Sequence, residues 1–408
     1  MPLFARLASG LTARRIRAHG IILALCMWLP YAYNLSPPGL WDRQGHIKGT
    51  DFVHFYTLGT LALEHRASDL YDTPAQERLI QQLVPGARGL YYVALYGPQV
   101  SLFFAPFAWL PYAWALTLWW VMSTLIYGAC CYLVFRTCPR LQEDRPIVLI
   151  LAFAYPAFFH LIAWGQTSAP AVLCFTASFL ALRKGRDFVA GLALGLLAFK
   201  PPLALAAGVV FLLAGEWKLI AGAAVSAATQ MAVGGIYYGI AVLRQYLAAL
   251  RNVPHLYPYL EPRPYAVHSL RSFWAILAPW PEVAFLLYLI SAGVVLWLTI
   301  RIWRGPADFS LRYSALLFAT ALVAPHLTVY DLVILAPALL LLADWTMAHI
   351  DDRYSPGLRL LLYLSYALPL FGPVTRWTHV QLSVLAFIGV MIWLGRLAER
   401  ESKKVAAA

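Results

Sequence analysis

Charged residues are scarce in this sequence. Only 12% of its residues are Asp, Glu, Lys or Arg, 61% are hydrophobic, and the mean hydropathy is +0.66. A soluble protein of 408 residues needs more polar surface, so the composition excludes a soluble globular class. Repeated apolar runs of membrane-spanning length instead indicate an integral membrane protein. We predict an all-α polytopic membrane protein that forms a single domain over residues 1–408.

Cysteine is also scarce, and its spacing has no metal-binding pattern. The five cysteines lie in or beside apolar runs: Cys26, Cys130, Cys131, Cys138 and Cys174. This excludes a disulfide framework and a zinc site of the usual kind. With no such spacing, we expect no metal and no cofactor. Internal repeats and low-complexity segments are absent as well.

Acidic residues are outnumbered by basic ones, and the formal net charge is +12. The basic residues sit mostly in short connectors beside apolar runs, which follows the positive-inside rule and argues against a nucleic-acid partner. The connectors that we expect on the cytoplasmic side contain Arg136/Arg140/Arg145, Arg183/Lys184/Arg186, Arg301/Arg304, Arg353/Arg359 and Arg396/Arg400/Lys403/Lys404. Both termini are then cytoplasmic, in a multi-pass protein of the cytoplasmic (inner) membrane whose first span is an uncleaved anchor.

About twelve apolar runs are candidates for transmembrane helices. They lie at 20–35, 112–135, 147–162, 167–183, 188–200, 201–213, 217–238, 283–301, 310–324, 330–348, 358–372 and 379–397. The parity of the basic connectors predicts that 95–110 is re-entrant or interfacial, because a full span there would place the next basic connector outside. The same parity predicts that 188–213 crosses twice, with a break at Lys200-Pro201-Pro202.

This topology places the unusual polar segments on one outer face, which is the periplasmic side. They comprise a first outer loop at 36–111, with surface helices and the re-entrant segment, a second outer loop at 239–282, and the shorter segments 164–168, 199–202, 325–331 and 372–379. Their convergence predicts a site at that face, since the orientation was set by Arg and Lys residues in other loops.

Two short helices are predicted in the first outer loop. Thr50 is placed to cap a helix that begins at Asp51. Further along, Thr73, Pro74 and Gln76 have the spacing of a capping box with proline at the first helical position. We expect both helices to lie along the membrane surface.

The stretch 49–72 concentrates acids, histidines and tyrosines between apolar segments. Asp51 is the leading candidate for a catalytic base, and His54, one helical turn along, is a candidate to orient or replace it. The alternative for Asp51 is a purely structural role, because an acid at a helix start gains about 0.3 to 1 kcal/mol from the helix dipole.

A lysine between two apolar runs suggests an anion site. Placing Lys200 at the bilayer centre costs on the order of 2.5 to 3.5 kcal/mol, so we expect it near the interface, where it contacts a phosphate. The alternative is snorkelling beside the Pro-Pro break. Arg271, Arg263 and Arg376 are also predicted to be external and are candidates to share a phosphate or pyrophosphate.

Further polar residues fall at the same outer face. His326 ends one span, and Tyr330 and Asp331 begin the next, so a catalytic role for His326 and substrate contacts for the other two are candidates. A capping role is the alternative. Gln166 is either a helix-start residue or a sugar contact.

Taken together, these residues resemble glycosyltransferase family 87, of the glycosyltransferase-C superfamily. The resemblance rests on Asp51-Phe52, Tyr56, Gly59, Leu70-Tyr71-Asp72, Tyr96-Gly97-Pro98, Pro106, Gly165-Gln166, Lys200-Pro201 and the segment 326–331. It covers most of the chain in order and spacing. The family includes mycobacterial mannosyltransferases that use polyprenyl-phosphate mannose. In the second outer loop His268 departs from the pattern, where a small polar residue is expected.

The resemblance implies an inverting glycosyltransferase with a glycosyltransferase-C-like fold. It moves a sugar, mannose in the first instance, from a polyprenyl-phosphate donor to a glycolipid or glycan acceptor at the outer face. Asp51 then matches the catalytic acid position, Lys200 the region near the lipid phosphate, and Tyr96 a substrate contact. A phosphate leaving group needs neither a general acid nor a metal. The alternative from another class is a polytopic transporter or lipid flippase, although transporters more often show repeats and mid-membrane charges.

Overall fold

The structure, a computed structural model, describes residues 8–407 except 88, 254 and 256–262. Within these ranges the chain folds into α- and 3-10 helices and contains no β-strand, which confirms the predicted all-α class. The stretch 254 and 256–262 of the predicted second outer loop lies outside the described residues.

Seven helical segments of the described chain are long and apolar enough to cross a membrane. They are α2 (Ala13–Leu35), α6 (Tyr112–Phe135), α12 (Trp217–Tyr238), α16 (Pro281–Arg304), η5 with α18 (Val329–Leu335 and Ala336–Ala348), α19 with η6 and α20 (Ser355–Ala367, Leu368–Val374 and Thr375–Thr378), and α21 (Leu382–Ala407). All seven coincide with apolar runs in the sequence.

The remaining apolar runs fold as bent or short helices. They are η2 with α7 (Leu141–Asp144 and Arg145–Phe153), α8 (Pro156–Trp164), α9 (Ser168–Arg183), α10 with η3 (Asp187–Gly195 and Leu196–Phe199), α11 (Pro201–Ala214) and α17 (Phe309–Val323). The first two form one segment bent by 41°. Counting that pair as one span gives up to eight candidates among the described residues, so twelve crossings remain a prediction.

The short helix α17 is the centre of the bundle. Every residue from Tyr313 to Val323 is buried, and the Tyr313 hydroxyl donates to the carbonyl oxygen of Phe175 on α9 (2.6 Å). A helix that is apolar on all sides is stable when other helices surround it. Its 15 residues therefore need not match the thickness of a bilayer, because its neighbours rather than lipid cover it.

The chain reverses direction at Lys200, as the sequence predicts. Gly191 packs against Leu219 and Gly195 against Ala223, so α10 and α12 run in the same direction. A tight turn at Gly215, in the left-handed conformation, joins α11 to α12. Since α11 turns back into α12, α10 and α11 must run in opposite directions on either side of the Lys200-Pro201 break.

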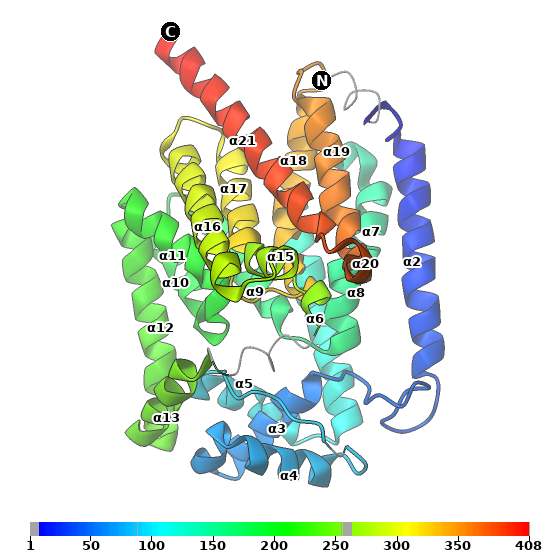
Figure 1. Cartoon of the computed structure of the whole chain (residues 1–408), viewed down its shortest axis with the longest axis vertical. Helices are drawn as coiled ribbons and strands as arrows, with labels where there is room; N and C mark the ends of the chain where they lie inside the picture. The colour runs from blue at the N-terminus through cyan, green and yellow to red at the C-terminus, as the bar shows by residue number, and fades with distance from the viewer. Residues whose placement is uncertain (1–7, 88, 254, 256–262, 408) are drawn as a thin grey trace.

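The two ends of the bundle differ in structure. Figure 1 places the C-terminal end of α21 and the turn between α18 and α19, which contains Arg353, at one end. The opposite end holds the shorter elements α3 (Phe52–Leu63), η1 (Ala67–Tyr71), α4 (Thr73–Leu83), α5 (Pro98–Ala108) and α13 (Ile240–Arg251). Between α13 and α16 the chain forms η4 (Pro264–Ala266) and α15 (Leu270–Leu277). The basic end of α21 and the Arg353 turn therefore lie at the opposite end from the short helices of the first outer loop.

Helix α3 packs into the protein and is not a solvent-exposed surface helix. Ten of its twelve residues are buried, and it lies against α5 with Gly59 next to the backbone of Phe104. A Cβ at Gly59 would lie 2.4 Å from the carbonyl oxygen of Phe104, so only glycine permits this approach. The segment 98–108 is an 11-residue helix, which is too short to span a bilayer alone.

Both predicted helix caps were wrong by one residue. Asp51 itself is the N-cap residue of α3, while the Thr50 hydroxyl donates to the carbonyl oxygen of Ile47. Asp72 caps α4 by accepting from the backbone N–H of Ala75, and the Gln76 amide donates to the carbonyl oxygen of Leu70 instead of closing a capping box. The Thr50 hydroxyl and the Gln76 amide each donate to a carbonyl oxygen instead, and at α4 the cap is the acid that precedes Thr73.

Thiol labelling tests the orientation. In a Cys26→Ser background, which removes the exposed native cysteine, a cysteine at exposed Gln44 should react with an impermeant maleimide in intact cells. A cysteine at exposed Lys184, in the turn between α9 and α10, should react only after permeabilisation. Labelling of the Lys184 position in intact cells would reverse the predicted topology.

Candidate functional site

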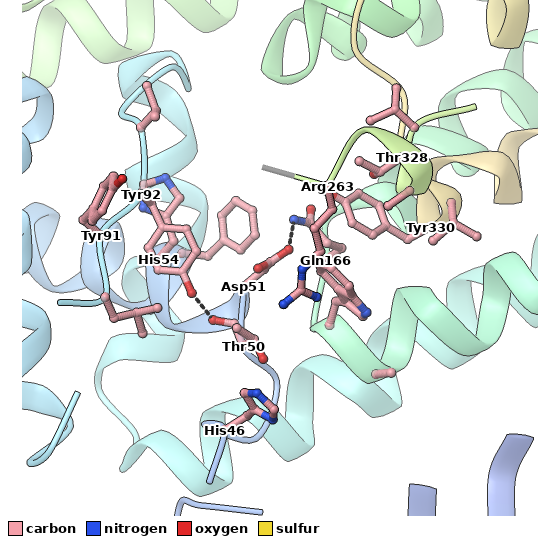
Figure 2. Close-up of a pocket in the computed structure, with 18 of the residues that line it drawn as sticks. His46, Thr50, Asp51, His54, Tyr91, Tyr92, Gln166, Arg263, Thr328 and Tyr330 are labelled. Carbon is pink, nitrogen blue, oxygen red and sulfur yellow. Dashed lines mark hydrogen bonds between the residues drawn. The ribbon is translucent and has the colours of Figure 1, made fainter. Parts of the chain in front are cut away.

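A cavity of about 630 Å³ lies where the loop segments meet the helical bundle. Its walls come from the end of α2, the loop before α3, the segment 90–96, the turn after α8, the segment before α15 and the turn before η5 (Figure 2). This volume is within the range of small-molecule sites. Seven of the predicted site residues line it: Asp51, His54, Tyr96, Gln166, Arg263, His326 and Tyr330.

Asp51 is held by the turn that follows α8. Its backbone N–H donates to the carbonyl oxygen of Trp164 (2.9 Å), and its Oδ2 accepts a hydrogen bond from Nε2 of Gln166 (2.6 Å). On the other side the Tyr92 hydroxyl donates to the carbonyl oxygen of Thr50. Figure 2 shows the Asp51 carboxylate between the tyrosines of segment 90–96 and the wall that carries Arg263 and Tyr330.

The surroundings of Asp51 favour a carboxyl that exchanges a proton near neutral pH. Burial raises the pKa of Asp51 from 3.8 to about 6, although the hydrogen bond from Gln166 and the positive charges of Lys200 and Arg263 act in the opposite direction. A base works best when its pKa lies near the working pH. The location of Asp51 and its raised pKa therefore make it a candidate general base.

His54 does not contact the Asp51 carboxylate as the sequence suggested. Its ring stacks on Tyr92 (5.0 Å between centroids) and tilts against Tyr96 (5.7 Å), and burial lowers the pKa of His54 to about 3. Within the described chain neither ring nitrogen has a hydrogen-bond partner. The orienting place expected for His54 is taken by Gln166, which is 115 positions away in the sequence.

Lys200 and Asp331 form a buried ion pair behind the cavity wall. Lys200 Nζ lies 2.5 Å from Oδ1 of Asp331 and 3.2 Å from the Ser168 hydroxyl, and its side chain is 9% exposed. Asp331 Oδ2 also accepts from the backbone N–H and the hydroxyl of Thr328, which closes a capping box at the start of η5. Neither charged residue belongs to the described cavity lining, although Lys200 Nζ lies 5.0 Å from the ring of Tyr330, which does.

The three candidate arginines lie in different places. Arg263 lines the cavity and is exposed. Arg376, on α20, donates to the Tyr265 hydroxyl (2.8 Å) and stacks on that ring, and Arg271 lies on α15, so neither belongs to the described lining. Of the predicted arginines, only Arg263 is thus placed to meet an anion in the cavity.

His268, which departs from the family pattern, lies next to the lining residue Val267 but is not itself in the described cavity lining. It is 1% exposed, its Nδ1 lies 2.8 Å from the Ser383 hydroxyl, and its backbone N–H donates to the carbonyl oxygen of Leu327 (2.9 Å). Beside it, the Gln381 amide donates to the carbonyl oxygens of Tyr265 and Val267. These bonds fix the segment before α15 against the turn that carries His326.

Several lining residues were missed by the sequence analysis. They include Tyr31, Asp42, Gln44, His46, Thr50, Tyr91, Tyr92, Trp164 and Thr328. Tyr91 and Tyr92 could have been found from the sequence, because they lie within five positions of Tyr96, which the sequence analysis singled out. No three His, Cys, Asp or Glu side chains of the described chain are grouped to hold a metal ion.

The fold and the cavity define a class: a polytopic helical membrane protein with a polar, acid-containing cavity at one end of the bundle. Residues 94–327, more than half of the chain, match the model of glycosyltransferase family 87. The chain belongs to this family and is a membrane glycosyltransferase. No curated protein and no solved structure matches it. The matched range includes Gln166, Lys200, Arg263 and His326, whereas Asp51 precedes it and Asp331 follows it.

The buried pair gives a prediction about stability. Lys200→Met should lower the free energy of unfolding by about 3 to 5 kcal/mol, because it leaves the carboxylate of Asp331 buried without its cation. Adding Asp331→Asn should recover more than half of the loss, since the amide is neutral and can still accept from Thr328. Thermal unfolding of the purified variants measures both effects. A Lys200→Met variant as stable as the parent would show that the pair does not form.

Proposed function

We propose that this glycosyltransferase transfers a sugar, mannose in the first instance, from a polyprenyl-phosphate donor to a glycolipid or glycan acceptor. The reaction takes place at the outer face of the cytoplasmic membrane with inversion at the anomeric carbon. The observation that carries the proposal is the Asp51 carboxylate, which lies in a sugar-sized cavity with a pKa raised to about 6.

Asp51 acts as the general base. It takes the proton of the acceptor hydroxyl while the hydroxyl oxygen forms its bond to the anomeric carbon. The bond between that carbon and the phosphate oxygen breaks, and its electron pair leaves with the lipid phosphate. The lipid phosphate leaves as a stable anion and needs no proton. One carboxylate therefore supplies the proton chemistry that the transfer needs.

The cavity also has a cation for the phosphate. Arg263 faces the cavity opposite the tyrosines of segment 90–96, and a guanidinium binds phosphate oxygens with paired hydrogen bonds (Figure 2). We assign the donor phosphate to Arg263. Lys200, paired with Asp331 behind Tyr330, supports that wall. His326, Tyr96 and Tyr330 are assigned to the sugar rings, because they line the same cavity.

Replacing the base tests the proposal. Asp51→Asn preserves the size of the side chain but cannot accept a proton, so turnover should fall by about 10² to 10⁴-fold while donor affinity stays close to that of the parent. Transfer from a radiolabelled polyprenyl-phosphate sugar by the purified protein gives the rate, and equilibrium binding of the same donor gives the affinity.

His326→Ala serves as the matched comparison, because His326 lines the same cavity. We expect this variant to lose part of its activity. If Asp51→Asn keeps more than about a third of the parent rate and His326→Ala is inactive, the base is His326.

The pH dependence follows from the raised pKa. A base must be ionised, so transfer should be at its plateau well above pH 6 and should fall as the pH drops through about 6. The residual activity of Asp51→Asn should lack this acid limb. The pH profile of kcat/KM measures it, and a midpoint near 4, the ordinary range of an aspartate, would contradict the assignment.

A further inference from the structure

The hydrogen bond between Gln166 and Asp51 distinguishes the two oxygens of the carboxylate. Oδ2 accepts from Nε2 of Gln166 at 2.6 Å, while Oε1 of Gln166 accepts from the backbone N–H of Thr167 at 3.2 Å. Because the carboxamide oxygen is used by an N–H donor, the NH₂ group must face Asp51. An NH₂ group only donates, so it stabilises the ionised form of Asp51 at Oδ2 and leaves Oδ1 for a proton from the cavity.

The backbone around Gln166 holds this amide in place. Gly165 has φ 67°, and a Cβ there would lie 2.7 Å from the Cβ of Phe52, so the turn packs directly on the start of α3. The carbonyl oxygen of Gly165 accepts from the indole of Trp119 (3.1 Å), and Gln166 itself is only 6% exposed. A side chain anchored in this way positions its partner without a loss of rotamer freedom during the reaction.

The geometry points to Gln166 as the positioning residue of the reaction: its amide selects Oδ1 of Asp51 as the oxygen that takes the acceptor proton and keeps that carboxylate ionised. This role rests on the proposed function of Asp51 as base. It differs from a role limited to sugar contact, because Nε2 of the amide donates a hydrogen bond to Asp51.

Other groups also act on Asp51 and must be kept constant in a test. The charged ones are Lys200, Arg263 and Asp331, and the titratable phenols around it are Tyr92, Tyr96, Tyr112 and Tyr330. None of them donates a hydrogen bond to the Asp51 carboxylate within the described chain, where Gln166 alone does so. A change at Gln166 thus removes one hydrogen bond and leaves the surrounding charges in place.

Gln166→Met tests the role with a side chain of similar length. Losing a hydrogen bond to a charged group should raise the midpoint of the acid limb by about one pH unit, so at pH 6 the rate relative to the plateau should fall about five-fold further than in the parent. Gln166→Glu places a second carboxylate beside Asp51 and should shift the limb further in the same direction. The KM for the donor should change little in Gln166→Met.

Gln381→Met is the control, because it also removes a buried amide, one with three hydrogen bonds, and none of these bonds is to Asp51. It should affect stability without moving the acid limb. An acid limb that stays at its parent midpoint in both Gln166 variants, or that moves equally in Gln381→Met, would overturn the positioning role.

A second measurement separates this inference from the proposed function. Infrared titration of the protonated carboxyl band of Asp51, assigned by its loss in Asp51→Asn, reports the pKa without turnover. If Asp51→Asn remains active but the pH midpoint of this band rises in Gln166→Met, the base assignment fails and the positioning contact stands. If the midpoint is unchanged in Gln166→Met, the role of Gln166 is wrong whatever the transfer rate.

Discussion

The buried ion pair between Lys200 and Asp331 is the interaction on which the cavity wall depends. Isolated charges are costly in a bundle of this composition, so each member needs the other. The pair joins the break before α11 to the start of η5, and Ser168 adds the start of α9 to the same cluster. Gln166 lies two residues before Ser168, and Tyr330 lies one residue before Asp331. The pair therefore fixes the relative positions of two cavity segments without lining the cavity itself.

Close backbone approach completes the site. The left-handed turn at Gly165 allows the segment after α8 to pack on Gly49 and Phe52, where a larger residue would collide. This approach lets Asp51 receive one backbone and one side-chain contact from the same turn. The carboxylate is then oriented before any substrate binds, so the proton transfer that we propose for Asp51 needs no reorganisation of this side chain.

The hydrogen bond between Gln166 and Asp51 joins the part of the chain that matches the family to the segment before it. The matched range, 94–327, supplies Gln166, Arg263 and His326, and the segment before it supplies Asp51. The first loop thus adds the acid to a framework of amide, guanidinium and imidazole groups. Burial of Asp51 raises its pKa, and the donors around it limit that rise, so the balance leaves a carboxylate suited to proton transfer near neutral pH.

Local properties of the sequence determined the helical class, the placement of the apolar helices and the reversal at Lys200-Pro201, because hydrophobicity and proline act over neighbouring residues. They also identified Asp51, Gln166, Arg263 and His326 as candidates, since polar groups between apolar runs need an aqueous cavity or a partner. The sequence could not show which polar groups meet. His54 is three positions from Asp51 yet turns away to stack on Tyr92, whereas Gln166 approaches from 115 positions away. Lys200 was expected at a phosphate and instead pairs with Asp331, 131 positions further on. Only the tertiary structure decided these pairings, because a hydrogen bond or ion pair depends on distances of a few ångströms that are set by the packing of whole helices.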